Sequence, residues 1–212
     1  MTVTGVEAYP KGKGRVSVYM NDEFAFVLYK GELSKYGLEI GRDINDELYE
    51  KIMHETIYPR AKKRGMNLLK SMDRTEADVR RKLSEGGYPA DAVDVAVDYL
   101  KSYHYIDDSR YASEYIRFKS SSMSRKQIIA KLTEKGVSKA VIRAAYDAYE
   151  EENGDNAHNS ERELIIKLIN KRFPGGVSGI DHNARQKLFA YLYSKGFSIS
   201  LIEEVYSSLD IT

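Results

Sequence analysis

Four histidines and one pair of adjacent aspartates are the first candidates in this chain for acid–base chemistry or metal binding. The histidines, His54, His104, His158 and His182, are scattered, and none has a partner at the spacing of metal ligands. Asp107–Asp108 could act as paired carboxylates, but the pair stands just before a helical pattern, where capping of the helix is the favoured role. The sequence therefore predicts no catalytic residue and no metal site.

A glycine-rich segment, Pro174–Gly179, is a further candidate, because loops of this composition can cradle phosphates. It lacks the Lys-Ser or Lys-Thr ending of a phosphate-binding loop, so a flexible connection between helices is the favoured interpretation. The chain has no cysteine, which excludes thiolate chemistry and disulfides and disfavours a zinc site. We expect a protein that is not an enzyme and that binds no cofactor.

Positive charge is concentrated in two blocks, although the net charge of the chain is only +1. Residues 60–82 hold nine Lys or Arg against three acidic residues, and a second basic block at residues 117–143 is followed directly by an acidic stretch. Such clusters make contact with a polyanion or an acidic partner as plausible as a merely solvated face. The candidate contact residues are Arg60, Lys63, Arg64, Arg74, Arg80, Arg81, Arg117, Lys119, Arg125 and Lys126.

These charged side chains belong to a sequence pattern that occurs three times. Residues 83–87, 132–136 and 192–196 each begin with Leu and end with Gly, and apolar residues recur at spacings of three and four on both sides of that Gly. The spacing predicts two amphipathic helices joined by a short turn, with the Gly in the left-handed conformation. A repeated pattern of this kind indicates a helical repeat architecture.

The repeats leave room for a third helix, which we place after each helical pair. The first would start at Asp107 or Asp108 and have Phe118 on its apolar side, and the second would start at a Ser160–Glu163 capping box after a solvated loop at residues 150–159. The third repeat would then be truncated.

Capping residues mark where the first helix of each pair should begin. Thr75 and Ser124 hold the same register in the first two copies, each followed three residues later by Asp or Gln. In the third copy Asn183 with Gln186 lies one residue out of that register.

The N-terminal residues differ in kind, because alternating apolar residues predict a three-stranded meander with hairpin turns at residues 10–14 and 21–22. Short helices at 30–36 and 46–56 should follow, and then a basic helix from Pro59 to about Met72. On that helix Arg60, Lys63 and Arg64 lie opposite the apolar stripe, which includes Met72. Arg74 and Arg81 should likewise face solvent on the next helix.

The predicted fold is mainly α, with tandem three-helix repeats forming an elongated, curved solenoid behind a small N-terminal β-meander. We place the segments at residues 1–57, 58–122 (the basic helix and first repeat), 123–176 (the second repeat) and 177–212 (the truncated third repeat). No apolar run is long enough to span a bilayer and no secretory signal is evident, so we expect a cytoplasmic protein.

Three stretches of the chain resemble the RecX family of regulatory proteins, which modulate the RecA recombinase. They are Leu68–Leu69 together with residues 74–83 and 87–88, residues 105–112 with their Ile-Asp-Asp sequence, and residues 128–136 with 138–146. The resemblance covers about residues 58 to 209, and the N-terminal segment is similar to an extension that some members carry.

The resemblance implies a non-enzymatic, monomeric regulator that binds the RecA–DNA filament along its groove and inhibits strand exchange and ATP hydrolysis. It also implies weaker binding to single- and double-stranded DNA, no membrane partner, and a role in homologous recombination, DNA repair and the SOS response.

Two other classes of function remain open from the residues alone. The chain could be a general nucleic-acid-binding helix-turn-helix module, or a protein–protein adaptor solenoid unrelated to DNA. The second helices of the first and third pairs carry acidic residues that would repel phosphate, which argues against the DNA-reading module: Asp91, Asp94, Asp98, Glu203 and Glu204. An adaptor would bind neither bare nor recombinase-coated DNA, whereas a simple DNA binder would prefer bare DNA.

Overall fold

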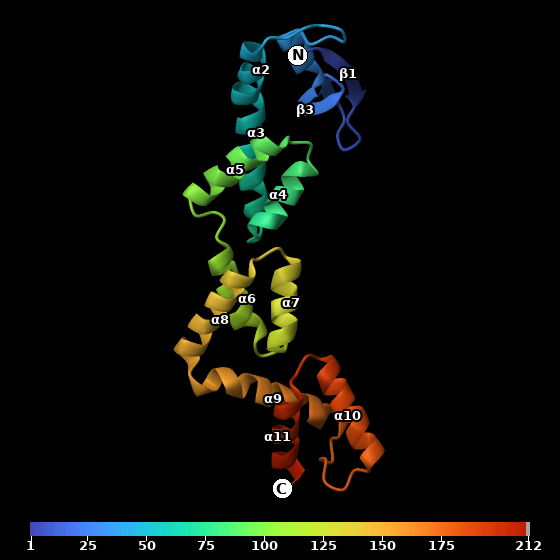
Figure 1. Ribbon diagram of the computed structural model, residues 1–212, viewed down its shortest axis with the longest axis vertical. Helices are drawn as coiled ribbons and strands as arrows, with labels where there is room; N and C mark the ends of the chain where they lie inside the picture. Colours follow the sequence, from blue (N-terminus) through green and yellow to red (C-terminus); the bar gives the residue numbers. More distant parts are fainter. Residues whose placement is uncertain (211–212) are drawn as a thin grey trace. The chain divides into compact units, whose positions relative to one another are not determined.

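The N-terminal strands form an antiparallel sheet in the predicted meander order (Figure 1). The structure, a computed structural model, describes residues 1–210, apart from the side chains of residues 155–158 and 210. Strands β1 (Val3–Ala8), β2 (Arg15–Met20) and β3 (Glu23–Tyr29) pair in sequence order. The hairpin at residues 21–22 is confirmed, because Asn21 and Asp22 both adopt positive φ, as the tight turns that match the twist of a hairpin require.

The chain divides into two compact units, Met1–Asp107 and Asp108–Thr212. In the first unit the sheet is followed by α1 (Lys30–Tyr36) and α2 (Asp46–Ile52), whose cap Asn45 accepts a hydrogen bond from the Leu48 amide at 2.9 Å. A π-helical turn, η1 (Met53–Ile57), joins α2 directly to the basic helix α3 (Tyr58–Leu69). Pro59, near the start of α3, has no backbone N–H to donate to the preceding turn. The wider π-helical turn before it changes the hydrogen-bond spacing there, and the helix continues. The basic helix is therefore continuous with α2 and ends before Met72, which is exposed and not part of the apolar stripe.

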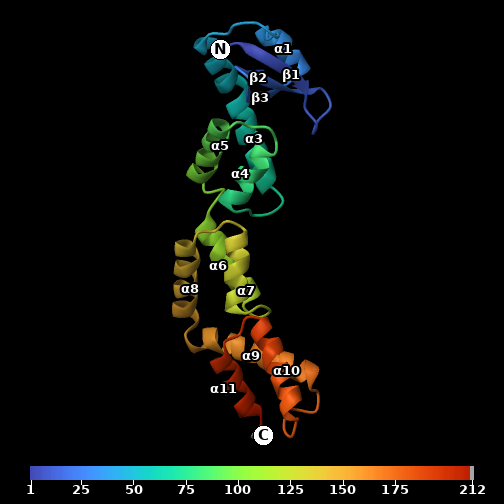
Figure 2. The same cartoon turned by 45° about the vertical axis from the view of Figure 1, so that its right-hand side comes forward.

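The first helical pair packs against α3 (Figure 2). Helices α4 (Glu76–Ser84) and α5 (Ala90–Ser102) bury their apolar stripes together with that of α3 and with one face of the sheet, in a single core. Thr75 caps α4 as predicted, because its hydroxyl accepts a hydrogen bond from the Asp78 amide. The sheet and the first repeat are thus one folded unit.

The second unit contains two separate hydrophobic cores. One is built from α6 (Asp108–Lys119), α7 (Arg125–Glu134) and α8 (Lys139–Asn153). The other is built from α9 (Asp155–Arg172), α10 (His182–Ser194) and α11 (Ile199–Asp210). The connecting helices α6 and α9 therefore pack with the pair that follows them, whereas the sequence placed each with the pair before it. In Figure 1, too, α9 lies beside α10 and α11.

Several local expectations for the second unit are wrong, each for a physical reason. Residues 150–159 are not a loop, because α9 begins directly after Gly154, and Ser160 therefore lies inside the helix instead of capping it. Helix α10 is capped by Asp181, whose carboxylate accepts a hydrogen bond from the Ala184 amide at 2.7 Å, so Asn183 lies within its first turn. Phe118 points to solvent with 76% of its surface exposed.

The predicted left-handed glycines are confirmed at all three turns. Gly87, Gly136 and Gly196 have φ values of 83°, 83° and 93°. At Gly87 there is also no room for a side chain, because an added Cβ would lie 2.5 Å from Val27 Cγ2 and 3.1 Å from the Tyr9 ring. The turn of the first pair is therefore pressed directly against the N-terminal sheet.

We expect Gly87→Ala to lower the free energy of unfolding by about 2–5 kcal/mol, because the left-handed backbone costs about 1–2 kcal/mol and the overpacking a further ~1–3 kcal/mol. Gly14→Ala is the matched control in the same unit, since Gly14 also has positive φ but an added Cβ there would meet nothing within 4 Å. Urea unfolding followed by circular dichroism measures both. Equal losses in the two variants would show that the contact with the sheet contributes nothing.

Candidate functional site

The exposed face of α3 carries two of the predicted contact residues, Lys63 and Arg64. Lys63 and Arg64 are exposed, and in the described part of the chain no carboxylate lies within ion-pair distance of either. Arg60 lies on the same face but is mostly buried. Its guanidinium pairs with Glu32, donates to the Val27 carbonyl oxygen at 3.4 Å and lies 5.0 Å from the centre of the Tyr29 ring. The expectation that Arg60 faces solvent is therefore wrong.

The arginines around α4 are engaged in a network of ion pairs. Arg74 is only 19% exposed, and its guanidinium donates to Asp78 at 2.7 Å and to the Leu68 carbonyl at 2.9 Å. This corrects the expectation that Arg74 faces solvent and could be replaced at little cost. Arg81 is exposed as predicted, but it pairs with Asp78 and with Glu85.

Arg80 joins α4 to α5, because it bonds to Glu76 at 2.8 Å and to Asp94 at 2.5 Å. The hydrogen bond from Lys101, helped by Arg80, holds the pKa of the Glu76 carboxyl below its ordinary value against the opposing effect of burial. Burial also acts to raise the pKa of Asp78, but hydrogen bonds from Arg74 and Arg81 outweigh it and keep that pKa below 3.8. The ion pairs between these arginines and the ionised carboxylates therefore stabilise the first helical pair.

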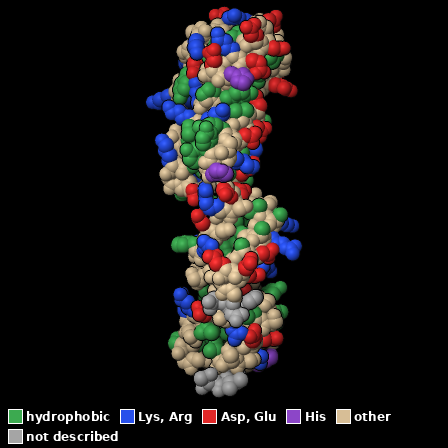
Figure 3. Space-filling view, turned by 90° about the vertical axis from the view of Figure 1, so that its left-hand side faces the viewer, with side chains coloured by type: hydrophobic (Ala, Val, Ile, Leu, Met, Phe, Trp, Pro, Cys, Tyr) green, Lys and Arg blue, Asp and Glu red, His purple; other side chains and the backbone are tan. Residues whose placement is uncertain are grey.

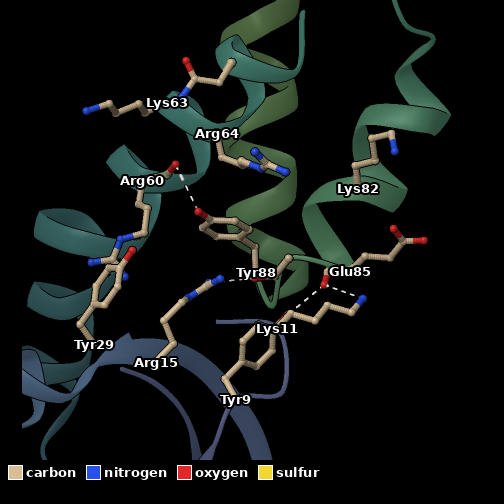
Figure 4. A pocket seen from close by; sticks show the side chains of 12 residues that line it. Tyr9, Lys11, Arg15, Tyr29, Arg60, Lys63, Arg64, Lys82, Glu85 and Tyr88 are labelled. Atoms are coloured by element: carbon tan, nitrogen blue, oxygen red, sulfur yellow. Dashed lines mark hydrogen bonds between the residues drawn. The ribbon is translucent and has the colours of Figure 1, made fainter. Parts of the chain in front are cut away.

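A cationic pocket of about 520 Å³ lies between the N-terminal hairpin, α3 and the turn after α4 (Figure 4). Its lining is six cations, one acid, three tyrosines and two further residues. They are Tyr9, Lys11, Arg15, Tyr29, Arg60, Lys63, Arg64, Asn67, Lys82, Glu85, Gly86 and Tyr88. The structure thus brings three of the predicted contact residues, Arg60, Lys63 and Arg64, together in one cavity.

The floor of the cationic pocket is held by donors of the hairpin that bind the C-terminal end of α4. The Tyr9 hydroxyl donates to the Glu85 carbonyl at 2.8 Å and Lys11 Nζ donates to the same oxygen at 3.2 Å. Arg15 donates to the Gly86 carbonyl at 3.0 Å. Cations are favoured at this end of a helix, where backbone carbonyls lack partners.

Tyrosine rings separate the cations of the pocket. Tyr9 lies under the Arg15 guanidinium at 4.7 Å, and Tyr29 under that of Arg60. Burial raises the pKa of the Tyr88 hydroxyl, which donates to the Arg60 carbonyl at 3.4 Å. The sequence analysis missed the hairpin and tyrosine members of the pocket. The turn at residues 10–14 holds two lysines next to an arginine of the following strand, and this cluster could have indicated the hairpin members of the pocket.

The four candidate cations of the second basic block contact neighbouring side chains. Arg117 pairs with Glu152, and Arg125 pairs with Glu150 and lies over the Tyr146 ring. Lys119 and Lys126 lie over aromatic rings, those of Phe118 and Tyr193. On the face in Figure 3, basic and acidic side chains are likewise intermixed within each unit.

Two of the histidines considered for chemistry contact a side chain four residues away along the chain. His54 lies 3.4 Å from Glu50, His182 contacts Gln186, and Asp108 is the first residue of α6. The side chain of His158 lies outside the described residues. Within residues whose side chains are described, no group of three or more metal-binding side chains occurs. No described helix has the length and apolar character needed to cross a membrane.

The acidic residues of the second helices are partly neutralised within each unit. Asp91 accepts a hydrogen bond from the Tyr58 hydroxyl at 3.1 Å. Burial, with this hydrogen bond, raises the pKa of Tyr58 to about 12. Glu204 pairs with Arg162 of α9. Helices α5 and α11 thus use part of their negative charge in internal contacts.

These features define a mainly helical protein of three-helix modules, preceded by a small sheet that forms a cationic pocket with the first module. Family models describe each part. The RecX first, second and third three-helix domains match residues 61–100, 107–145 and 160–206, and the regulatory protein RecX N-terminal domain matches residues 1–45. The chain belongs to the RecX family of regulatory proteins.

Relatives and solved structures agree with this assignment over nearly the whole chain. Regulatory protein RecX of Clostridium acetobutylicum is 29% identical over 204 residues, which are 96% of this chain and 94% of that protein. The corresponding protein of Clostridioides difficile is 25% identical over 98% of this chain and 95% of its own.

Two solved structures share the fold. A crystal structure of a regulatory protein RecX is 25% identical, with a TM-score of 0.62, and the match covers 97% of this chain and 98% of that one. RecX from Lactobacillus salivarius is 23% identical with a TM-score of 0.62, over 74% of this chain and 98% of its own, and supports the fold alone. The predicted fold class and family are confirmed.

Replacing Arg74 should destabilise the first unit, in contrast to the sequence-based expectation. We expect Arg74→Gln to cost about 1–2 kcal/mol, because a mostly buried guanidinium loses hydrogen bonds to a carboxylate and a carbonyl. Arg64→Gln, at an exposed position on the neighbouring helix, should cost less than about 0.5 kcal/mol. Urea unfolding of both variants at neutral pH tests the contrast, and an equal cost would contradict the structural role of Arg74.

The stability difference between the parent and Arg74→Gln should shrink in acid. The folded-state pKa of Asp78 is lowered, so its contribution is complete above 3.8 and is lost as the pH falls from 3.8 through the folded value. Unfolding measured from neutral pH to below 3.8 should show the two curves converging. A difference that stays constant across this range would exclude the Arg74–Asp78 pair as its source.

Proposed function

We propose that this protein acts in the cytoplasm on the RecA–DNA filament and inhibits ATP hydrolysis and strand exchange by the recombinase, without catalysis of its own. The observation that carries the proposal is the match of the RecX N-terminal domain and all three RecX three-helix domains along this one chain. Its relatives are named regulatory proteins, which fits a protein that works by binding.

The charge distribution supports a partner that presents both phosphate and protein. The first unit offers free cations at Lys63 and Arg64, and the internal ion pairs around α4 leave acidic and basic side chains side by side. A positive patch can contact phosphate, while mixed charges can fit complementary groups on a protein.

A general DNA-reading module is less well supported than a filament regulator. In such modules a helix lies in the major groove, contacts the base edges and runs between the two phosphate backbones. Helix α5 carries Asp91, Asp94 and Asp98 on its surface, and even with Asp94 paired to Arg80 this helix would be repelled.

The test is the rate of RecA ATP hydrolysis on single-stranded DNA as this protein is added. We expect the rate to fall with added protein. The variant Lys63→Glu with Arg64→Glu should need about tenfold more protein for the same inhibition, which corresponds to about 1.4 kcal/mol of binding energy. It should keep the parent's circular dichroism and melting midpoint, because both side chains are exposed.

Lys30→Glu with Lys51→Glu is the matched control, since it reverses two exposed lysines of the same unit outside the cationic pocket. This control should inhibit like the parent. Inhibition that is lost equally in both pairs would mean that only net charge matters. If neither pair weakens inhibition, the contact lies elsewhere, and the block of Arg117, Lys119, Arg125 and Lys126 becomes the next candidate. A rate unaffected by the parent protein would refute the proposed function.

A further inference from the structure

We infer that the cationic pocket is a binding site for single-stranded nucleic acid, which holds backbone phosphates on its cations and bases against its tyrosine rings. The inference deepens the proposed function, because it states which component of the filament the first unit contacts. It concerns only this unit, so it can be tested without RecA.

The pocket has a strong excess of positive charge. Six of its lining side chains are cationic and one, Glu85, is acidic, and Glu85 already pairs with Arg81 outside the pocket. Lys63 and Arg64 both line the cavity, and Figure 4 shows Lys63 extending away from the other side chains. Cations without internal acidic partners are free to bind phosphate.

Arg15 adds a donor that the protein itself does not use. Its Nε is buried and has no hydrogen-bond partner among the described residues, although the guanidinium also donates to Gly86. A buried donor without a partner is costly. Arg15 lines the cavity, so its guanidinium also adds positive charge for a phosphate that enters the pocket.

The tyrosines give the pocket a second kind of surface. Tyr29 is 48% exposed, and the Arg60 guanidinium lies over its ring, so the pair forms a platform on which a base can stack. Tyr9 and Tyr88 are partly exposed on the other walls of the cavity. A pocket that offers both rings and cations suits a nucleic-acid strand, whose bases can stack on the rings while its phosphates bind the cations.

A single strand fits these features better than a duplex or an acidic peptide. In a duplex the bases are already stacked and cannot reach the tyrosine rings, whereas a single strand leaves their faces open. The faces of aromatic rings carry negative charge, so they disfavour the carboxylates of an acidic peptide. A volume of about 520 Å³ lies in the range of pockets that hold small molecules and leaves room for a nucleotide.

The test is the change in fluorescence anisotropy of a labelled oligothymidylate on addition of the full-length protein, over a series of salt concentrations. We expect binding that weakens with salt. Lys63→Glu with Arg64→Glu should weaken it and reduce the slope of log K against log salt by about 1.4, which is two phosphate contacts at about 0.7 each on a single strand. Lys30→Glu with Lys51→Glu should leave the slope unchanged.

The role of the rings is tested by Tyr29→Ala, which should weaken binding about fivefold or more, the lower limit for loss of one stacked base. Tyr103→Ala is its control, since Tyr103 is a more exposed tyrosine of the same unit that lies outside the pocket. It should bind like the parent. A melting curve for each variant separates loss of binding from loss of fold.

Competitors distinguish the kinds of ligand. Unlabelled oligothymidylate should displace the probe well, thymidine monophosphate weakly, and a duplex of equal length less well than the single strand. Displacement by polyglutamate at concentrations as low as those of the oligonucleotide would overturn the inference in favour of an acidic peptide, and equal displacement by duplex would overturn the role of the rings. If the probe does not bind but RecA ATP hydrolysis is still inhibited, the pocket inference fails and the proposed function stands.

Discussion

The helix ends at the left-handed glycine turns are the constraint on which much of this structure depends. A helix leaves its last carbonyls without partners, and they must find donors elsewhere. In the first unit the donors come from the hairpin, from Tyr9, Lys11 and Arg15. In the second unit the Ser124 hydroxyl donates to the Lys195 carbonyl at 2.7 Å, and an added Cβ at Gly196 would lie 2.6 Å from Ser124 Oγ.

Ser124 shows how closely these contacts are shared between modules. It is fully buried, it caps α7 by accepting from the Gln127 amide, and it satisfies the turn of the following repeat with its own proton. One hydroxyl thus starts one helix and completes the end of another. In the first unit Tyr9, Lys11 and Arg15 donate to the carbonyls at the end of α4. Because two of these three side chains are cationic, the contact between hairpin and helix end also concentrates positive charge. The cationic pocket is a by-product of closing a helix end.

Turns and helix caps could be predicted from the sequence because they depend on interactions between residues a few positions apart. The turn glycines, the caps Thr75 and Ser124 and the hairpin at Asn21–Asp22 follow from backbone conformation and short-range hydrogen bonds. The prediction that Ser160 caps a helix was wrong because polar residues can equally form the first turns of a longer helix. The prediction for Asn183 was wrong because Asp181, two residues earlier, is an equally good cap.

The site could be predicted only in part, because it is made by long-range contacts. Periodicity placed Lys63 and Arg64 on the exposed face of α3, but it could not show that Arg60 and Arg74 are drawn into internal ion pairs. Nor could it bring a hairpin to the end of α4, since no spacing along the chain encodes that approach. The repeats and motifs of the sequence were enough to predict the fold class and the family, whereas the pocket could be found only in the three-dimensional structure.

The separation between the hairpin and its partner carbonyl has a consequence for the order of folding during synthesis. Tyr9 and Glu85 are 76 residues apart, whereas the three-helix modules are built from neighbouring segments. Contacts between distant residues form late, because the chain between them must first be made and closed into a loop. The hairpin is therefore synthesised long before the helix end that it contacts, and the positive charge of Lys11 and Lys13 at its tip disfavours pairing of its strands with other chains in the meantime. The contacts of the hairpin are thus completed only after the first repeat has folded.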